Sequence, residues 1–186
     1  DRLIEMAETL QCDVAVIGAG TAGLAAERAA RNNGASTLLI DPDFNGTTCA
    51  TVGCMPSKLL IAAGRKAVQI SRAGMFGIEV DGVRIDGPAV LQRVRAEGDR
   101  FAAGTRKSIA DLPEHVTIRA RACFSGPRRL LLDDGRSVEA RAIVIATGSA
   151  PILPEPFAAL GDAALTSDSI FELADLPRRL AVVGSA

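Results

Sequence analysis

The sequence contains no tryptophan, no tyrosine and only one histidine among its 186 residues. It also has no excess of charge of either sign, since 21 basic residues stand against 22 acidic ones. Proteins that bind nucleic acid or anionic membranes usually carry a basic patch, often with aromatic residues interleaved. The composition therefore makes nucleic acid and a membrane surface poor candidate partners.

Long apolar runs are also scarce. The longest, VAVIGAGTAGLAA at residues 14–26, contains three glycines and follows Glu8 and Asp13 instead of basic residues. Neither a signal peptide nor a membrane span has this pattern. We therefore expect a soluble, cytoplasmic protein, and its 48% of hydrophobic residues are enough for a buried core.

Cysteine is too rare for a disulfide scaffold, because the chain has only four. Cys12 and Cys123 lie in apolar, strand-like segments, and free cysteine packs as a small hydrophobe. We predict that both are core residues. Cys49 and Cys54 remain, five positions apart in TTCATVGCMPSK, residues 47–58.

Three interpretations of this pair differ in plausibility. A zinc site needs further ligands, but no second CxxC exists and His115, far along the chain, is interpreted as a surface loop residue. No metal is therefore expected. A structural disulfide would close a very short loop and is unusual in a cytoplasmic protein. A redox-active pair is the favoured interpretation.

The backbone around the pair is predicted to depart from a regular helix. Residues five apart in an α-helix have Cα atoms about 8.6 Å apart, beyond the roughly 7 Å that a disulfide bridges. Gly46 and Gly53 permit unusual angles, and Pro56 favours an early helical turn. A distorted helix start would lower the pKa of a thiol. Lys58 then falls one turn after Cys54 on the same face.

The beginning of the chain predicts an α/β protein with a Rossmann-like domain. Residues 12–20 form a buried strand without polar alternation, which favours a parallel sheet. Residues 21–34 form a helix that stops at Gly34, and residues 36–41 form a second strand. This is the βαβ unit of a nucleotide-binding fold. Residues 1–11 are interpreted as an extension before the core.

A helical insertion follows, with helices at residues 57–74 and 86–112. Asp86 lies near the start of the second and Pro88 in its first turn. Residues 116–124 then form one strand, and residues 128–149 form a β-hairpin or meander whose turn contains Asp133, Asp134 and Gly135.

Pro151, Pro154 and Pro156 indicate a boundary between a domain at residues 1–150 and a segment at residues 151–186. Residues 180–183 are predicted to be a buried strand, after which residues 184–186 begin a second βα turn. We infer that the chain is a fragment, truncated at the start of a second nucleotide-binding domain.

Residues 18–23, Gly-Ala-Gly-Thr-Ala-Gly, fit the GxGxxG fingerprint between a strand and a helix. Gly18 permits the tight turn, Gly20 lets a pyrophosphate approach, and Gly23 lets helix and strand pack closely. The helix N-terminus adds donors and partial positive charge. Asp41, 18 residues after Gly23, can take the two hydroxyls of a ribose. Dinucleotide binding is predicted, and a glycine-rich turn with an incidental aspartate is the alternative.

Four motifs occur in the order found in one known family: VAVIGAGTAG, GTTCATVGCMPSK, VIATGSAPILP and LAVVGSA. Over nearly its whole length the chain resembles the flavin disulfide reductases with a CxxxxC centre, the class I pyridine nucleotide-disulfide oxidoreductases. Met55-Pro56-Ser57-Lys58 resembles the dihydrolipoamide dehydrogenase and mercuric reductase branch more than glutathione reductase. Thr47 is a departure, since many members have glycine there.

The resemblance implies FAD as cofactor, and NAD in the full-length protein. Residues 18–23 would hold the pyrophosphate, Asp41 the ribose, Thr48 the phosphates and the Ala122 backbone the adenine. The full implied set of cofactor-binding residues is Gly18, Ala19, Gly20, Thr21, Ala22, Gly23, Asp41, Gly46, Thr47, Thr48, Cys49, Cys54, Lys58, Ala122, Ala146, Thr147, Gly148 and Gly184.

The resemblance also implies the catalytic residues. Cys49 would be the interchange thiol that meets the substrate, Cys54 the thiol that faces the flavin, and Lys58 would lie near the flavin N5. Electrons would pass from dihydrolipoamide, free or on a lipoyl domain, through the disulfide and FAD to NAD+. The full-length protein is expected to be a homodimer with a His-Glu acid/base pair outside this chain, so little turnover is expected of the fragment. The alternatives are mercuric reductase, another NAD(P)H-disulfide reductase, or a non-catalytic redox-sensing module.

Overall fold

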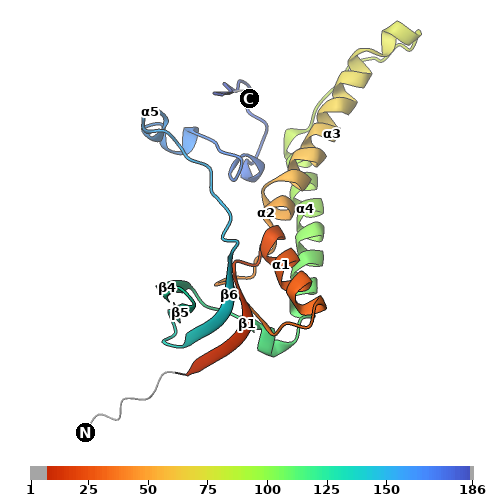
Figure 1. Ribbon diagram of the computed structural model, residues 1–186. Helices are drawn as coiled ribbons and strands as arrows, with labels where there is room; N and C mark the ends of the chain where they lie inside the picture. The colour runs from red at the N-terminus through yellow and green to blue at the C-terminus, as the bar shows by residue number, and fades with distance from the viewer. Residues whose placement is uncertain (1–7, 185–186) are drawn as a thin grey trace. The chain divides into compact units, whose positions relative to one another are not determined.

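The computed structural model describes residues 8–184 and contains two compact units. The first joins the described part of Asp1–Thr48 to Ala102–Ala150. The second joins Cys49–Phe101 to the described part of Pro151–Ala186. Figure 1 follows the chain through both units. The division into domains at residues 1–150 and 151–186 stays a prediction.

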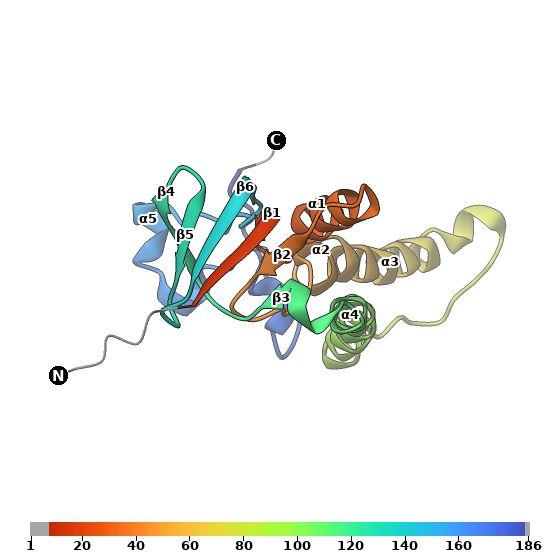
Figure 2. The same ribbon diagram turned by 60° about the horizontal axis from the view of Figure 1, so that its bottom comes forward.

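One six-stranded sheet forms the centre of the first unit. Its order is β3-β2-β1-β6-β5-β4, which Figure 2 shows from β4 to β3. β3, β2, β1 and β6 run parallel, while β4, β5 and β6 form an antiparallel meander, as predicted. The strands are β1 (Thr9–Ile17), β2 (Thr37–Ile40), β3 (Thr117–Ile118), β4 (Ala122–Gly126), β5 (Arg129–Leu132) and β6 (Ser137–Ile145).

β1 is buried on both faces, which explains its apolar sequence without alternation. Ala15 packs in one core cluster with residues of β2, β5 and β6, and Val16 packs in another, against which Leu24 of helix α1 (Thr21–Asn32) rests. The strand begins at Thr9, earlier than predicted, because its first residues pair with β6. The hydroxyls of Thr9 and Ser137 lie 2.9 Å apart. Residues 1–7 of the predicted extension lie outside the described residues.

A buried carboxylate joins α1 to β2. Glu27 is 1% exposed, accepts a 2.7 Å hydrogen bond from the Arg31 Nε, and accepts a second, 3.1 Å bond from the Thr37 hydroxyl. α1 ends at Asn32, just before the predicted stop at Gly34, whose φ of 81° is one that glycine adopts readily. These contacts fix α1 against β2.

We expect Glu27→Gln to destabilise the protein by about 1–2 kcal/mol, because a charge-assisted bond is lost and a buried amide N–H has no acceptor. Urea unfolding measures the change. Glu97→Gln is the matched control, because the Glu97 pair with Arg100 is solvent-accessible and should be worth less than about 1 kcal/mol. Equal losses in both variants would contradict this role for Glu27.

The strand predicted at residues 116–124 is wrong, because two strands lie there at opposite edges of the sheet. β3 pairs with β2, β4 pairs with β5, and the chain crosses the core between them with Ala120 buried. Arg121 turns the chain, since its N–H donates to the Asp133 Oδ1 and its carbonyl accepts the Asp133 N–H, both at 3.0 Å. Apolar residues occupy every second position from Val116 to Phe124. This regular alternation gives no sign that one strand ends and another begins within these residues.

The two cysteines expected in the core, Cys12 and Cys123, differ in their burial. Cys12 is partly buried against the core of β5 and β6, and this burial raises its pKa to about 11, consistent with an inert packing residue. Cys123 is exposed, so that prediction is wrong. β4 is an edge strand, and its three middle residues, Cys123, Phe124 and Ser125, are all exposed.

Helices form most of the second unit: α2 (Thr48–Thr51), α3 (Cys54–Ser71), the 3-10 turn Ala73–Phe76, α4 (Gly87–Ala110), α5 (Glu155–Ala158), and the 3-10 turns Gly161–Ala163 and Ile170–Glu172. α2 and α4 each extend into the first unit. α4 begins as predicted, because the Asp86 carboxylate accepts the Ala89 N–H at 3.0 Å while Pro88 occupies the first turn. His115 is exposed and lies in the Glu114–Val116 turn of the first unit.

Residues 171–173 bind α4, and no strand follows β6 within the residues described. Arg95 donates hydrogen bonds to the carbonyls of Phe171 and Leu173, at 3.1 and 2.9 Å. The buried strand predicted at residues 180–183 is wrong, since Val182 is 79% exposed. A buried parallel strand needs paired neighbours and covering helices, and no described residue pairs with this segment. Ser185 and Ala186 of the predicted turn lie outside the described residues.

Across residues 8–184, no helix is both long enough and apolar enough to cross a membrane.

Candidate functional site

The fingerprint turn packs tightly between the carboxyl ends of three strands. Gly18 has a φ of 101°, and its N–H donates to the Ile40 carbonyl at 2.8 Å. A Cβ at Gly18 would collide with the Ala146 carbonyl oxygen, and a Cβ at Gly23 would collide with the Gly18 carbonyl oxygen. Both glycines are therefore required for α1 to approach the strand ends.

Gly20 has a different environment. It is the N-cap residue of α1, makes no side-chain cap hydrogen bond, and a Cβ placed on it would meet no protein atom within 4 Å. The first turn of a helix presents backbone N–H donors and partial positive charge. Open space at this position fits the pyrophosphate of a dinucleotide.

Asp41 organises the backbone beside the fingerprint turn. Its Oδ2 accepts the Ala19 N–H at 2.8 Å, and its Oδ1 accepts the N–H groups of Asp43 and Phe44 at 3.0 and 2.7 Å. A carboxylate has about four acceptor positions, so these protein donors leave room for about one further hydroxyl. The sequence did not reveal this structural role of Asp41.

A cavity of about 390 Å³ opens where β1, β2 and β6 end. The carboxyl edge of a parallel sheet is where nucleotides bind in such folds. Five residues singled out from the sequence line this cavity: Gly18, Asp41, Gly46, Ala122 and Thr147. Among the lining residues that the sequence reasoning missed, Asp43, Asn45 and Arg121 have polar or charged side chains. The only feature of the sequence that could have identified them is that they lie within a few residues of Asp41 or Ala122.

The remaining predicted cofactor residues lie in several places. Ala146 follows β6, and its N–H donates to the Ile17 carbonyl at 2.8 Å. Gly148, two residues after Ala146, is exposed and has a φ of 72°. Thr48 is the first residue of α2. Gly184 belongs to the second unit and is exposed.

Cys49 and Cys54 lie on either side of a break between two helices. Cys49 belongs to α2, Cys54 is the first residue of α3, and Gly53 between them has a φ of −113° and a ψ of −112°. The Gly53 carbonyl accepts the Ser57 hydroxyl at 2.7 Å and so holds the first turn of α3. Both cysteines are free thiols, and their side chains are hydrogen-bonded to each other. The predicted departure from a regular helix is thus a complete break.

The hydrogen bond that the Cys49 thiol donates to the Cys54 sulfur raises the pKa of Cys49. Burial and the charge of the Cys54 sulfur raise this pKa further, while the Cys54 backbone N–H and the Lys58 ammonium lower it. The effects that raise the pKa of Cys49 outweigh those that lower it. The lowered thiol pKa predicted for a helix start is therefore wrong for Cys49. The reason is the hydrogen bond to the neighbouring Cys54 sulfur, which the helix start alone does not predict. Lys58 is close enough to this pair to act on its charge.

No group of three or more His, Cys, Asp and Glu residues within the described part of the chain could hold a metal ion.

The model of the pyridine nucleotide-disulphide oxidoreductase family matches residues 12–186. The chain belongs to this family. Membership confirms the fold class and the expected cofactors of these oxidoreductases, FAD and, in the full-length enzyme, NAD. The open N-terminus of α1 and the cavity beside Asp41 fit the nucleotide part of FAD.

Curated relatives with three different activities are similar to the chain. It is 35% identical over 177 residues to a dihydrolipoyl dehydrogenase of Chlamydia pneumoniae, covering 95% of this chain and 38% of the relative. A mercuric reductase of Streptomyces lividans is 34% identical over 177 residues, with 92% and 37% covered. A glutathione reductase of Burkholderia cepacia is 33% identical over 172 residues, also with 92% and 37% covered. The chain thus spans less than two fifths of each relative.

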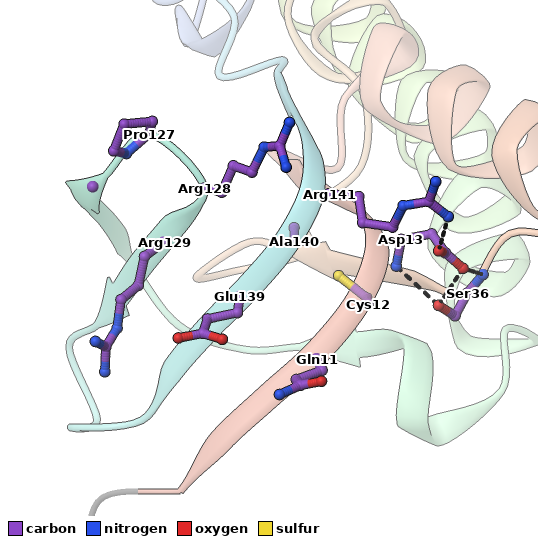
Figure 3. Close-up of a pocket in the computed structure, with 11 residues that line it drawn as sticks. Gln11, Cys12, Asp13, Ser36, Pro127, Arg128, Arg129, Glu139, Ala140 and Arg141 are labelled. Carbon is purple, nitrogen blue, oxygen red and sulfur yellow. Dashed lines mark hydrogen bonds and ion pairs between the residues drawn. The ribbon is translucent and has the colours of Figure 1, made fainter.

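A second cavity of about 540 Å³ lies toward the beginning of β1 and β6. Figure 3 shows Asp13 joined by dashed lines to Arg141 and Ser36, with Arg128 extending from the turn between β4 and β5. The Asp13 carboxylate accepts the Ser36 N–H and hydroxyl at 2.9 and 2.8 Å and pairs with Arg141 at 3.1 Å. Of the cofactor residues predicted from the sequence, none lines this cavity.

The Ser36 N–H and hydroxyl, and then Arg141, hold the pKa of Asp13 below its ordinary value. A lowered pKa in the folded state means that ionised Asp13 stabilises the protein above its ordinary pKa near 4, and that this contribution is lost as the pH falls through the folded value. We expect Asp13→Asn to be less stable at pH 7, with the difference from the unsubstituted protein shrinking below about pH 4. Urea unfolding at several pH values measures this difference, and a gap that persists unchanged to pH 2 would contradict the assignment.

Proposed function

We propose that the chain is the FAD-binding and dithiol part of a dihydrolipoamide dehydrogenase, which oxidises dihydrolipoamide with NAD+ as acceptor. The hydrogen-bonded thiols of Cys49 and Cys54 at a helix break are the observation that supports it most. The similarity to a dihydrolipoyl dehydrogenase and the sequence Met-Pro-Ser-Lys after Cys54 support the choice of substrate. When bound, FAD would carry the two electrons of the dithiol pair on to NAD+.

The residues of the first unit would hold the nucleotide. The backbone of residues 18–23 binds the pyrophosphate in the open space before Gly20, and Asp41 accepts about one ribose hydroxyl in addition to its backbone donors. Thr48 would contact the phosphates. Ala122 would reach the adenine through its backbone, and Ala146, Thr147 and Gly148, which follow β6, would complete the contacts.

The dithiol pair performs the exchange with substrate. In its oxidised state Cys49 and Cys54 share a disulfide, and a thiolate of dihydrolipoamide attacks the Cys49 sulfur while Cys54 leaves as a thiolate. The second substrate thiol then attacks the substrate sulfur of this mixed disulfide, Cys49 leaves, and the proton of the attacking thiol ends on the Cys49 sulfur. Lipoamide leaves with its disulfide closed, so the substrate loses two electrons and the pair gains two.

The observed charges suit the reduced pair. The raised pKa of Cys49 keeps its proton on sulfur at neutral pH, where the hydrogen bond to Cys54 stabilises it. The Lys58 ammonium offsets the negative charge that the exchange leaves on sulfur. The pair can therefore hold one proton and one negative charge between substrate exchange and the next electron transfer.

A homodimer is part of this proposal. Large apolar side chains after α3 are exposed, with Met75 at 81%, Phe76 at 80% and Ile78 at 59%. A second copy of the full-length chain covering them would remove this apolar surface from water. Sedimentation of the full-length protein tests the state, and a monomer at micromolar concentration would contradict it. A cytoplasmic location stays a prediction from composition.

Steady-state assays of the full-length protein with dihydrolipoamide, glutathione disulfide and mercuric ion in parallel test the substrate. We expect kcat/KM to be highest for dihydrolipoamide with NAD+. A preference for mercuric ion or glutathione disulfide would instead assign one of those activities, and redox titration of the cysteines without any turnover would indicate a sensing module. Since the chain has no tryptophan or tyrosine, bound flavin should dominate its absorbance, and a colourless protein that takes up no FAD would refute the cofactor assignment.

A further inference from the structure

The loop that follows β2 contains a strained residue. Phe44 has a φ of 51°, and among residues 8–184 it is the one residue other than glycine with a positive φ. A bulky side chain is rare in this region of backbone conformation, and such a position persists only where surrounding contacts maintain it. Phe44 is also buried, in the core cluster that contains Val16 and Leu39.

Two charged side chains bind the backbone of this loop, one at its N–H groups and the other at its carbonyl groups. Asp41 accepts the N–H groups of Asp43 and Phe44. Arg119 binds the carbonyl groups, since its Nη1 donates to Asp43 at 2.7 Å and to Pro42 at 3.3 Å. The guanidinium carbon of Arg119 also lies 5.4 Å from the centroid of the Phe44 ring, within the range of a cation–π interaction.

The loop held in this way is a wall of the nucleotide cavity. Pro42, Asp43 and Asn45 line the cavity together with Gly18 and Asp41. Arg119 and Phe44 are not among its lining residues. Arg119 therefore acts on the cavity indirectly, through the backbone carbonyls of two lining residues. It can do so because the chain crosses the core between β3 and β4, where Arg119 follows Ile118.

We propose that Arg119 is a positioning residue of the FAD site, which keeps the wall at residues 42–45 in the shape that meets the adenosine half of the cofactor. This inference rests on the proposed function, because it takes the 390 Å³ cavity as the FAD site. If the wall already has its bound conformation, FAD binding does not pay the entropy cost of ordering it. Arg119 can therefore raise the affinity for FAD without contacting the cofactor.

Arg119→Gln in the full-length protein, stripped of cofactor, tests the proposal. Loss of the hydrogen bonds and the ring contact should lower FAD affinity about tenfold in a fluorescence titration. In the cofactor-free protein, the amide hydrogens of Asp43 and Phe44 should exchange faster with solvent. Arg119→Lys keeps a cation over the ring but loses the planar fork, so its affinity should lie between the two. Arg129→Gln removes the same charge from β5, outside the cavity, and should leave affinity unchanged.

The outcomes separate this inference from the proposed function. If the unsubstituted protein binds FAD and Arg119→Gln binds it equally well, Arg119 has only a structural role and the inference fails alone. If the unsubstituted protein binds no FAD, both fail. Should Arg119→Gln not fold, Phe44→Leu removes the ring contact more gently and should still weaken FAD binding, and unchanged affinity in both Phe44→Leu and Arg119→Lys would overturn the inference.

Discussion

Replacing Cys54 by serine should lower the turnover of dihydrolipoamide by the full-length protein by at least about a thousandfold, because a serine hydroxyl can neither form the disulfide nor accept its electrons. Cys49→Ser should be equally damaging. Cys123→Ser is the matched control, since Cys123 is an exposed thiol on β4, outside the helix break. Turnover near the unsubstituted level in either variant of the pair would show that the two sulfurs do not carry the reaction.

The same substitution should change the reactivity of the remaining thiol. The hydrogen bond to Cys54 is the largest cause of the raised pKa of Cys49, so Cys54→Ser should bring this pKa down. Because the thiolate is the reactive form, Cys49 in the variant should be alkylated by iodoacetamide at lower pH than in the reduced unsubstituted protein. Mass spectrometry of the peptide containing Cys49 gives the pH profile, and a profile that stays in place or moves to higher pH would contradict the hydrogen bond to Cys54 as the cause of the raised pKa.

Replacing Gly23 by alanine should destabilise the protein by about 1–3 kcal/mol, the usual cost of inserting a methyl group into a tightly packed site. The new Cβ would collide with the Gly18 carbonyl, and α1 would have to move away from the strand ends. Because the helix N-terminus would move with it, FAD binding should be lost as well. Urea unfolding of the cofactor-free protein and titration with FAD measure the two effects.

Gly20→Ala separates packing from binding. A Cβ there meets no protein atom, and the φ of −77° suits any residue, so the stability of the cofactor-free protein should hardly change. FAD affinity should nevertheless fall, because the methyl group would enter the space assigned to the pyrophosphate. Gly104→Ala, in α4 with no neighbour within 4 Å, should be neutral or slightly stabilising and leave binding intact. Unchanged FAD affinity in Gly20→Ala would contradict the placement of the pyrophosphate.

Features that depend on neighbouring residues in the chain were predicted correctly. The apolar run around Ala15 and Val16 predicts a strand covered on both faces, and Gly34 with a positive φ ends α1 where expected. The hairpin turn at Asp133, Asp134 and Gly135 also forms, because turn residues adopt their conformation from local hydrogen bonds and backbone freedom.

Features that depend on distant partners were missed or predicted wrongly. The alternation of residues 116–124 does not show that the chain leaves one edge of the sheet and joins the other. The apolar sequence of residues 180–183 predicts a strand, but no described strand pairs with these residues. The helix start near Cys54 predicts a lowered thiol pKa, whereas the neighbouring sulfur raises that of Cys49.

The sequence by itself determined the family motifs, the βαβ unit and the identity of the paired cysteines, because each is written in residues that are close along the chain. Only the tertiary structure decided that Asp41 binds three backbone N–H groups, that Arg119 holds the loop around Phe44, and that Arg121 lines the nucleotide cavity. These contacts join residues that are up to 77 positions apart, and their geometry exists only after the sheet has assembled and brought the ends of its strands together.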